Sequence, residues 1–290
     1  MPTAEKRIKV SESDKKFYEE NGYLIVRNVL TEEQVAFLRK RFLDIWETDE
    51  WKVCESNTDR NLVDLYKYFP EVMRLTLTKD VVDIAKYLIG EDHLVLIPET
   101  AAMKGFYPTW HKDTTTPERY GHTFHLRPDF KVIRCGFYLQ NNNEYGGGLS
   151  VFEGSHKTPD NLVGDFPERT LLTRIKDRLT SNAEEKSKFL NPHNLKLVDI
   201  PSHAGDLVFF NFKIVHKGTL PRSQRIADVP EDMTKVAMFD IFGANNEPTK
   251  LYIDFLKTRP ESLYSFAKNP KKSQEFEDHM KDIGLDVDLA

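Results

Sequence analysis

Hydrophobic side chains recur at helical spacing in the first third of the chain. Four of them are three or four residues apart: Val35, Leu38, Phe42 and Ile45. They predict a helix that begins after Thr31, with Gln34 at the capping-box position, and that extends to about residue 48. Further helices are predicted at residues 13–20 and 79–89, each of which is followed closely by a glycine.

Beyond residue 90 the pattern changes to short apolar runs bounded by turn residues, which is typical of strands buried in a sheet. The runs occupy residues 94–98, 130–139, 206–215 and 235–242. A segment of mixed charge at about residues 160–194 interrupts them, and a long insertion of this kind often borders a substrate pocket. The tail at about residues 245–290 is expected to form helices packed on the sheet. Its aromatic residues include Tyr252, Phe255, Tyr264 and Phe266.

We expect the 290 residues to form a single domain, residues 1–290. Strand-rich folds with added helices reach this length as one unit. Within the domain, N-terminal helices at about residues 11–90 precede a core of strands at about residues 91–243, which contains the insertion. The helical tail follows the core and offers a surface for a second copy, so the expected state is a monomer or a homodimer.

Charge and cysteine content narrow the class of protein. The formal net charge is −5 and no long cluster of lysine or arginine occurs, which argues against nucleic acid or an anionic membrane surface as a partner. Cys54 and Cys135 lie far apart without zinc-like spacing, so neither a disulfide framework nor a zinc site is expected. No run approaches the ~20 apolar residues of a membrane span, and the polar N-terminus does not resemble a signal peptide. The expected location is the cytoplasm.

The candidate chemistry lies in a His-x-Asp triplet and one distant histidine. His111 and Asp113 form the triplet, and His216 follows an apolar run about a hundred residues later. Residues i and i+2 of an extended chain point the same way, so the triplet can reach one ion if it is extended. Two imidazoles and one carboxylate form the facial set of non-haem Fe(II) oxygenases, which leaves metal positions open. The alternative for His216 is a structural histidine at the end of a buried strand.

Four segments in the same order make the chain similar to the phytanoyl-CoA dioxygenase family of Fe(II)- and 2-oxoglutarate-dependent oxygenases. They are residues 17–31, 110–113, 139–157 and 205–216. The chain departs from the family at Glu153, where a proline is usual. The resemblance implies a mainly β fold with flanking helices, in which a double-stranded β-helix forms a jelly-roll, cupin-like barrel. It also implies that His111, Asp113 and His216 bind Fe(II), and that 2-oxoglutarate and dioxygen are consumed.

The basic residue that would pair with the far carboxylate of 2-oxoglutarate is less clearly placed. The family's arginine commonly lies about ten residues past the second histidine and opens the next strand. Arg225 fits this distance best and is favoured here, with Arg222 second. Lys235 fits the strand position, although a lysine is a point charge and lacks the two-pronged geometry of a guanidinium. Arg134 is a further candidate, because an arginine within an apolar strand must face either solvent or a wet cavity.

The predicted reaction is hydroxylation of an unactivated C–H bond of a small metabolite, with release of succinate and carbon dioxide. Asp113 disfavours halogenation, since the related halogenases have a small residue there. Basic and hydrogen-bonding residues follow the triplet: Arg119, His122, His125 and Arg127. They suit a polar or anionic substrate such as a sugar acid or a biosynthetic intermediate. The alternative is a non-catalytic, metal-binding cupin-like protein, which an absent 2-oxoglutarate anchor would favour.

Overall fold

The computed structural model describes residues 8–48, 61–63, 65–107, 109–158, 195–222, 225–258 and 273–286. Its α-helices are α1 (Glu12–Asn21), α2 (Glu32–Glu47), α3 (Leu65–Tyr68), α4 (Pro70–Thr76), α5 (Lys79–Ile89), α6 (Thr115–Arg119), α9 (Glu247–Thr258) and α10 (Gln274–Asp282). Its strands are β1 (Tyr23–Val26), β2 (Asn61–Val63), β3 (Leu94–Leu96), β4 (Ala101–Lys104), β5 (Val132–Tyr138), β6 (Leu149–Phe152), β7 (Leu197–Asp199), β8 (Leu207–Asn211), β9 (His216–Gly218) and β10 (Val236–Ala244).

Capping side chains set the start of the first two helices. Ser11 caps α1 and exchanges hydrogen bonds with Asp14, while Thr31 caps α2 and exchanges hydrogen bonds with Gln34. Each pair satisfies two backbone N–H groups that the helix itself leaves without partners. The predicted start of α2 is confirmed, and α5 ends at Gly90 in the left-handed conformation, as expected.

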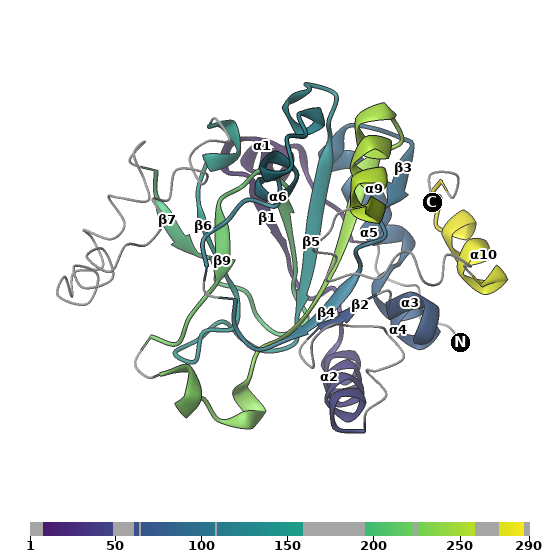
Figure 1. The fold of residues 1–290 in the computed structure, drawn as a ribbon. Coiled ribbons are helices and arrows are strands. Elements are labelled where there is room, and N and C mark those ends of the chain that lie inside the picture. The colour runs from purple at the N-terminus through teal and green to yellow at the C-terminus, as the bar shows by residue number, and fades with distance from the viewer. Residues whose placement is uncertain are drawn as a thin grey trace.

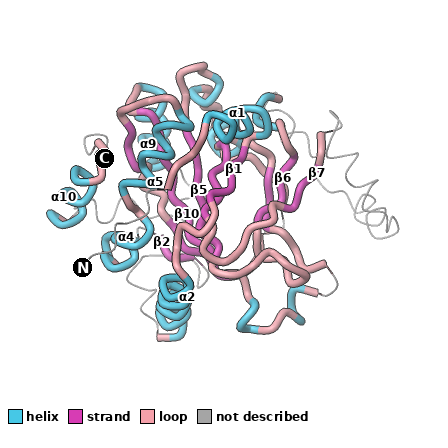
Figure 2. Tube along the Cα trace, turned by 180° about the vertical axis from the view of Figure 1, so that it is seen from behind, coloured by secondary structure: helices cyan, strands magenta, loops and turns pink. Residues whose placement is uncertain are grey.

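The strands form two antiparallel sheets. The larger sheet has the order β1-β8-β5-β10-β4-β2, with β3 paired to β10, and the smaller sheet has the order β7-β6-β9. Figures 1 and 2 show α2, α4 and α5 on the side of the larger sheet that faces away from β6 and β7. The architecture is therefore a mixed fold of helices and antiparallel sheets, in which β5 and β10 occupy the middle of the larger sheet.

Successive side chains of the larger sheet alternate between two cores. Phe209 and Met238 join the cluster that the helices cover, whereas Phe210 and Phe239 belong to a cluster that includes Val151 of the smaller sheet. The second cluster lies between the sheets, and it forms the apolar floor next to which polar side chains of the same strands gather.

One predicted strand is divided. The apolar run at residues 206–215 was expected to be a single strand ending at His216, but β8 ends at Asn211. A turn follows, in which the carbonyl of Asn211 accepts from the N–H of Ile214 at 2.9 Å and its side-chain oxygen accepts from the N–H of Lys213 at 2.9 Å. His216 therefore begins β9, in the other sheet. The insertion at about residues 160–194, and Tyr264 and Phe266 of the tail, lie outside the described residues.

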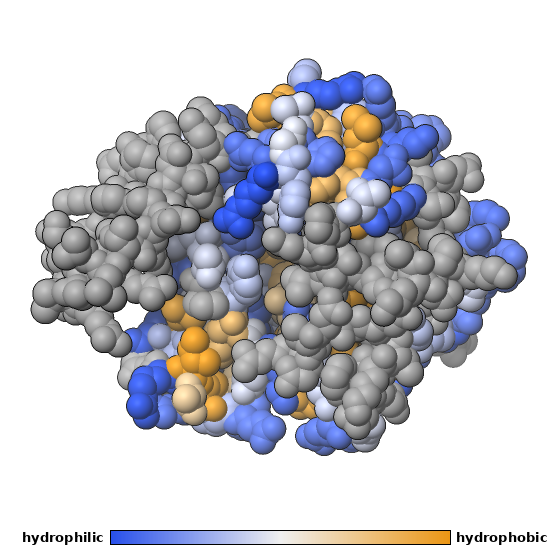
Figure 3. Space-filling model, in the orientation of Figure 1, coloured by the Kyte–Doolittle hydropathy of each residue, from blue (hydrophilic) through white to orange (hydrophobic). Residues whose placement is uncertain are grey.

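Hydrophobic side chains are exposed on the surface in a few places. Figure 3 shows such side chains at the lower left of one face, over the segment between β9 and β10, where Ile226 and Met233 are exposed. Among the helices that the structure describes, none has the length and apolar character needed to cross a bilayer.

Candidate metal centre

His111, Asp113 and His216 lie together between the two sheets. One potential ligand atom from each residue lies within 4.8 Å of the others. The backbone produces this arrangement, since the N–H of His111 donates to the carbonyl of His216 at 3.0 Å and the N–H of His216 donates to that of His111 at 2.9 Å. This reciprocal pair places the imidazole rings side by side, with centroids 4.2 Å apart. The structure thus brings together the three residues that the sequence suggested.

Each of the two imidazoles is oriented by a backbone carbonyl two residues before it in the sequence. Nδ1 of His111 is 2.9 Å from the carbonyl oxygen of Thr109, and Nδ1 of His216 is 3.0 Å from that of Ile214. A carbonyl only accepts, so each Nδ1 carries the proton and each Nε2 keeps its lone pair. Histidines that bind metals are commonly oriented through their second nitrogen in this way.

Charge and burial also suit a cation. Burial, together with the neighbouring His111, lowers the pKa of His216 to about 3, and burial lowers the pKa of His111 as well. Burial opposes ionisation of Asp113, but the charge and hydrogen bond of Arg134, together with the two neighbouring imidazoles, outweigh it, and the carboxyl pKa lies below its usual value. Both imidazoles are therefore neutral and the carboxylate is charged at neutral pH. Oδ2 of Asp113 is buried and has no hydrogen-bond partner among the described residues, which leaves this acceptor for a metal ion.

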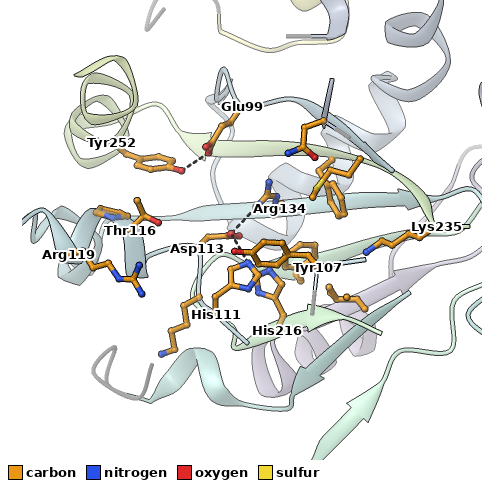
Figure 4. A pocket seen from close by; sticks show the side chains of 18 residues that line it. Glu99, Tyr107, His111, Asp113, Thr116, Arg119, Arg134, His216, Lys235 and Tyr252 are labelled. Carbon is orange, nitrogen blue, oxygen red and sulfur yellow. Dashed lines mark hydrogen bonds and ion pairs between the residues drawn. The ribbon is translucent and has the colours of Figure 1, made fainter. Parts of the chain in front are cut away.

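A pocket of about 360 Å³ surrounds the three side chains. Figure 4 shows His111, Asp113 and His216 in its middle, Lys235 on one side, and Thr116, Arg119 and Tyr252 on the other. Glu99 lies above the three candidate ligands, beside the Tyr252 hydroxyl. We call the side of the pocket that contains Lys235 and the side that contains Thr116, Arg119 and Tyr252 its two arms, and each contains a charged side chain.

Lys235 contributes the ammonium group of one arm. The residue is only 4% exposed, and its ammonium lies 5.5 Å from the ring centre of Tyr138 and 5.9 Å from that of Phe239. Space for the ammonium comes from Gly218, since a Cβ at that position would lie 3.2 Å from Nζ. Burial lowers the pKa of Lys235 to about 8. A buried ammonium of this kind is stabilised by an anion that enters the pocket.

Arg134 lies on β5, between β8 and β10, and lines the pocket. Its Nη1 donates to Oδ1 of Asp113 at 2.8 Å, and the two side chains are 13% and 8% exposed. Of the two possibilities for Arg134, exposure to solvent is therefore wrong, and the side chain faces the pocket. This ion pair orients the Asp113 carboxylate beside the imidazoles, and the same Oδ1 atom lies 3.9 Å from Nε2 of His111.

The two arginines first considered for 2-oxoglutarate lie elsewhere. Arg225 has a side chain that is 84% exposed and pairs with Asp228 at 2.8 Å, while Arg222 pairs with Asp199 at 3.6 Å. Neither lines the pocket. Sequence distance pointed to Arg225, but a turn of 3-10 helix follows it and the chain reaches the pocket only at Lys235.

Glu99 and Tyr252 are among the pocket residues that sequence reasoning missed, and it misplaced others. The Tyr252 hydroxyl donates to Oε2 of Glu99 at 2.8 Å in a buried contact. Tyr252 was assigned to packing because it lies in an aromatic tail, and the only signal for Glu99 was an acid directly after a strand-like run. Of the basic residues after the triplet, Arg119 lines the pocket. His125 is fully buried, and Arg127 pairs with Asp129 and Glu247 on the outside.

Comparison with known proteins places these features in a family. The profile of "Phytanoyl-CoA dioxygenase (PhyH)" matches residues 18–228. The ectoine dioxygenase of Sphingopyxis alaskensis is 23% identical over 209 residues, which cover 69% of this chain and 67% of the relative. The crystal structure of EctD from S. alaskensis with bound Fe has a TM-score of 0.58 at 17% identity and covers 83% of this chain and 79% of that chain.

A third likeness is to SnoK, a non-haem α-ketoglutarate-dependent carbocyclase from nogalamycin biosynthesis. Its TM-score is 0.55 at 17% identity, and the match covers 81% of this chain and 85% of that chain. The relatives are dioxygenases or α-ketoglutarate-dependent enzymes, so the predicted class of enzyme is confirmed. Iron and 2-oxoglutarate, which is α-ketoglutarate, are the cofactors named for them. Because the profile matches well over half of the sequence, this chain belongs to the phytanoyl-CoA dioxygenase family.

Proposed function

We propose that the protein is an Fe(II)- and 2-oxoglutarate-dependent dioxygenase that hydroxylates a small, polar or anionic metabolite and releases succinate and carbon dioxide. The observation that carries this proposal is the convergence of His111, Asp113 and His216 on one space, with the Asp113 Oδ2 atom left without a partner among the described residues. The two sheets on either side of this space are the halves of the double-stranded β-helix, within a single domain.

His111, Asp113 and His216 would hold the iron through the two Nε2 atoms and one carboxylate oxygen. Their ordinary protonation states suit this role, because neutral imidazoles and a charged carboxylate are ligands without further proton loss. When bound, the iron and its co-substrate supply the oxygen chemistry. Arg134 would position Asp113 for this role by donating to Oδ1 of the carboxylate.

Lys235 is the proposed partner of the far carboxylate of 2-oxoglutarate, in place of Arg225. It lines the same pocket as the candidate ligands and carries a buried positive charge. A carboxylate beside it would restore a charge pair in surroundings that exclude water. The alternative of a non-catalytic cupin-like protein depended on the lack of such an anchor, and Lys235 removes that argument.

The pocket volume limits the substrate. About 360 Å³ lies near the lower end of the ~300–1,000 Å³ range of small-molecule sites. Such a pocket has room for 2-oxoglutarate and a small metabolite, but not for the whole of an acyl-coenzyme A. The substrate would occupy the arm next to Thr116 and Arg119, on the other side of the candidate ligands from Lys235.

Anaerobic titration tests the proposal. Purified protein freed of metal is titrated first with Fe(II) and then with 2-oxoglutarate, while the weak visible charge-transfer band of the chelate is followed. We expect the band in the wild type and in the surface control His93→Ala, and we expect its loss in His111→Ala. Iron binding without any band in the wild type would contradict the assignment of 2-oxoglutarate.

A further inference from the structure

Lys235 lies at the end of an exposed segment, directly before β10. Residues 231–233 are exposed, whereas Lys235 is buried. Figure 4 shows its side chain extending from the backbone toward the candidate ligands. A lysine stem is flexible and its ammonium is strongly hydrated, and the ends of strands open more readily than their middles. The ammonium therefore stays in the pocket only if the backbone around it is held in place.

Gln140, which follows β5, holds the chain on one side of Lys235. Its Oε1 atom accepts from the N–H of Val236 at 2.7 Å, and its Nε2 atom donates to the carbonyl of Gly147 at 2.8 Å, both in buried contacts. The fit at Gly147 is close, because a Cβ there would lie 3.1 Å from Cγ of Gln140. The bond to Gly147 fixes the orientation of the amide, so its oxygen faces Val236.

Arg39 of α2 holds the chain on the other side of Lys235. Its Nη2 atom donates to the carbonyls of Asp232 and Thr234, each at 2.8 Å. Its Nη1 atom donates to Oε1 of Gln140 at 3.3 Å. A guanidinium can make these contacts together because its donors form a rigid, planar fork. Arg39 thus joins α2 to the segment before β10 and to the amide that binds the first residue of that strand.

The contacts of the two side chains alternate along the backbone, at positions 232, 234 and 236, on both sides of Lys235. The carbonyl of Lys235 itself accepts from the N–H of Gly105 at 2.8 Å. In an extended chain successive side chains point to opposite faces, so a fixed backbone also fixes the face to which Lys235 points. Held in this way, its ammonium lies in the buried position beside Tyr138 and Phe239.

We propose that Arg39 and Gln140 are positioning residues for 2-oxoglutarate, because they hold the backbone around Lys235 and so keep its ammonium where the far carboxylate binds. This inference rests on the proposed function, in which Lys235 binds that carboxylate. Neither Arg39 nor Gln140 lines the pocket, so each acts through Lys235. An ammonium that is already in place raises affinity, since binding then need not order it.

The first test compares two identical substitutions on α2. Arg39→Met removes the contacts with the segment before β10, whereas Arg41→Met removes a contact between Nε of Arg41 and Glu71 at 3.1 Å. Anaerobic titration of the charge-transfer band measures the affinity for 2-oxoglutarate. If the ammonium is in place in a tenth of the Arg39→Met molecules, the dissociation constant rises about tenfold. We expect this rise in Arg39→Met alone, and equal affinities in the two variants overturn the proposal.

A double-mutant cycle separates positioning from a general loss of structure. Arg39→Met is placed both in the wild type and in Lys235→Met. Because Arg39 acts through Lys235, the loss of affinity should be about tenfold in the wild type and less than about twofold in the variant without the ammonium. Gln140→Met tests the other side of Lys235 in the same cycle, and the same result is expected. Equal losses in both backgrounds overturn the proposal.

The pH dependence of affinity reports where the ammonium lies. Burial lowers the pKa of Lys235 to about 8 in the wild type. In Arg39→Met the side chain reaches water more often, so its pKa should rise toward the ordinary value of 10.5. The decline in 2-oxoglutarate affinity should then begin at a higher pH than in the wild type. A general loss of stability would leave the pH of this decline unchanged, and that result overturns the proposal.

The same measurements distinguish this inference from the proposed function. Loss of affinity in Lys235→Met, with equal affinities in Arg39→Met and Arg41→Met, overturns the positioning role and leaves the proposed function in place. Unchanged affinity in Lys235→Met overturns the anchor, and this inference with it. Absence of the band in the wild type would contradict the co-substrate itself.

Discussion

Replacing Lys235 with methionine should weaken 2-oxoglutarate binding while making the metal-free protein more stable. Burial lowers the lysine pKa from 10.5 to about 8, which corresponds to about 3 kcal/mol of unfavourable free energy for the charged form. Because the folded pKa lies below the unfolded value, this cost is fully present at pH 7 and disappears as the pH rises through 8 toward 10.5. Methionine has a similar length and no charge, so the free energy of unfolding should rise by up to about 3 kcal/mol at pH 7.

The same substitution should raise the dissociation constant of 2-oxoglutarate. Removing one member of a buried charge pair costs about 2–5 kcal/mol, so we expect at least a ~30-fold loss of affinity. Titration of the charge-transfer band measures the affinity, and urea unfolding of the metal-free protein measures the stability. A purely structural lysine would give the opposite result, with lower stability and unchanged affinity, and that outcome would refute the assignment.

Dependence on pH gives an independent check with Lys235→Arg as the matched control. In the wild type the ammonium loses its proton above pH 8, so 2-oxoglutarate affinity should fall by about tenfold for each further pH unit. The guanidinium of the arginine variant stays charged, and its affinity should be nearly flat over the same range. If the affinity for 2-oxoglutarate fell equally with pH in both proteins, the titrating group would be one other than Lys235.

Three further predictions concern neighbouring positions. Gly218→Ala should weaken 2-oxoglutarate binding by about tenfold and leave iron binding intact, because the added Cβ would lie 3.2 Å from Nζ of Lys235. Titration of the charge-transfer band measures this affinity, and an unchanged affinity would contradict the prediction. Arg134→Leu should lower the free energy of unfolding of the metal-free protein by about 3 kcal/mol, because Asp113 loses its buried partner. Fe(II) should then stabilise the variant more than it stabilises the wild type. Equal stabilisation of both proteins by Fe(II) in thermal melts would contradict this prediction. Burial raises the pKa of Asp240 to about 7, so wild-type stability should fall from pH 4 to 7, and Asp240→Asn should remove that decline in urea unfolding.

Local patterns were predicted well because their causes lie within a few residues. Thr31 and Gln34 are three positions apart, and the start of α2 followed from them. The ligand spacing of His111 and Asp113 is equally local, whereas the choice of His216 depended on its place after a distant apolar run and on the family resemblance.

Features that depend on contacts between residues far apart in the sequence could not be predicted from local spacing. The turn at Asn211 divides an unbroken apolar run, and only the pairing of the two sheets shows that His216 starts a new strand. The contact between Glu99 and Tyr252 joins residues 153 positions apart, and no local pattern signals it. Arg225 was favoured by counting positions, but it does not line the pocket, whereas Lys235, directly before β10, does.

The reciprocal backbone pair between His111 and His216 closes a long loop of the chain, within which the insertion at about residues 160–194 lies. The entropy of closing a loop grows only with the logarithm of its length, so doubling the loop costs about 0.6 kcal/mol. The geometry of the histidines is thus nearly insensitive to how many residues the insertion contains. A change in the length of that segment is therefore expected to leave the proposed iron ligands in place, so that one reaction centre could be adapted to many substrates.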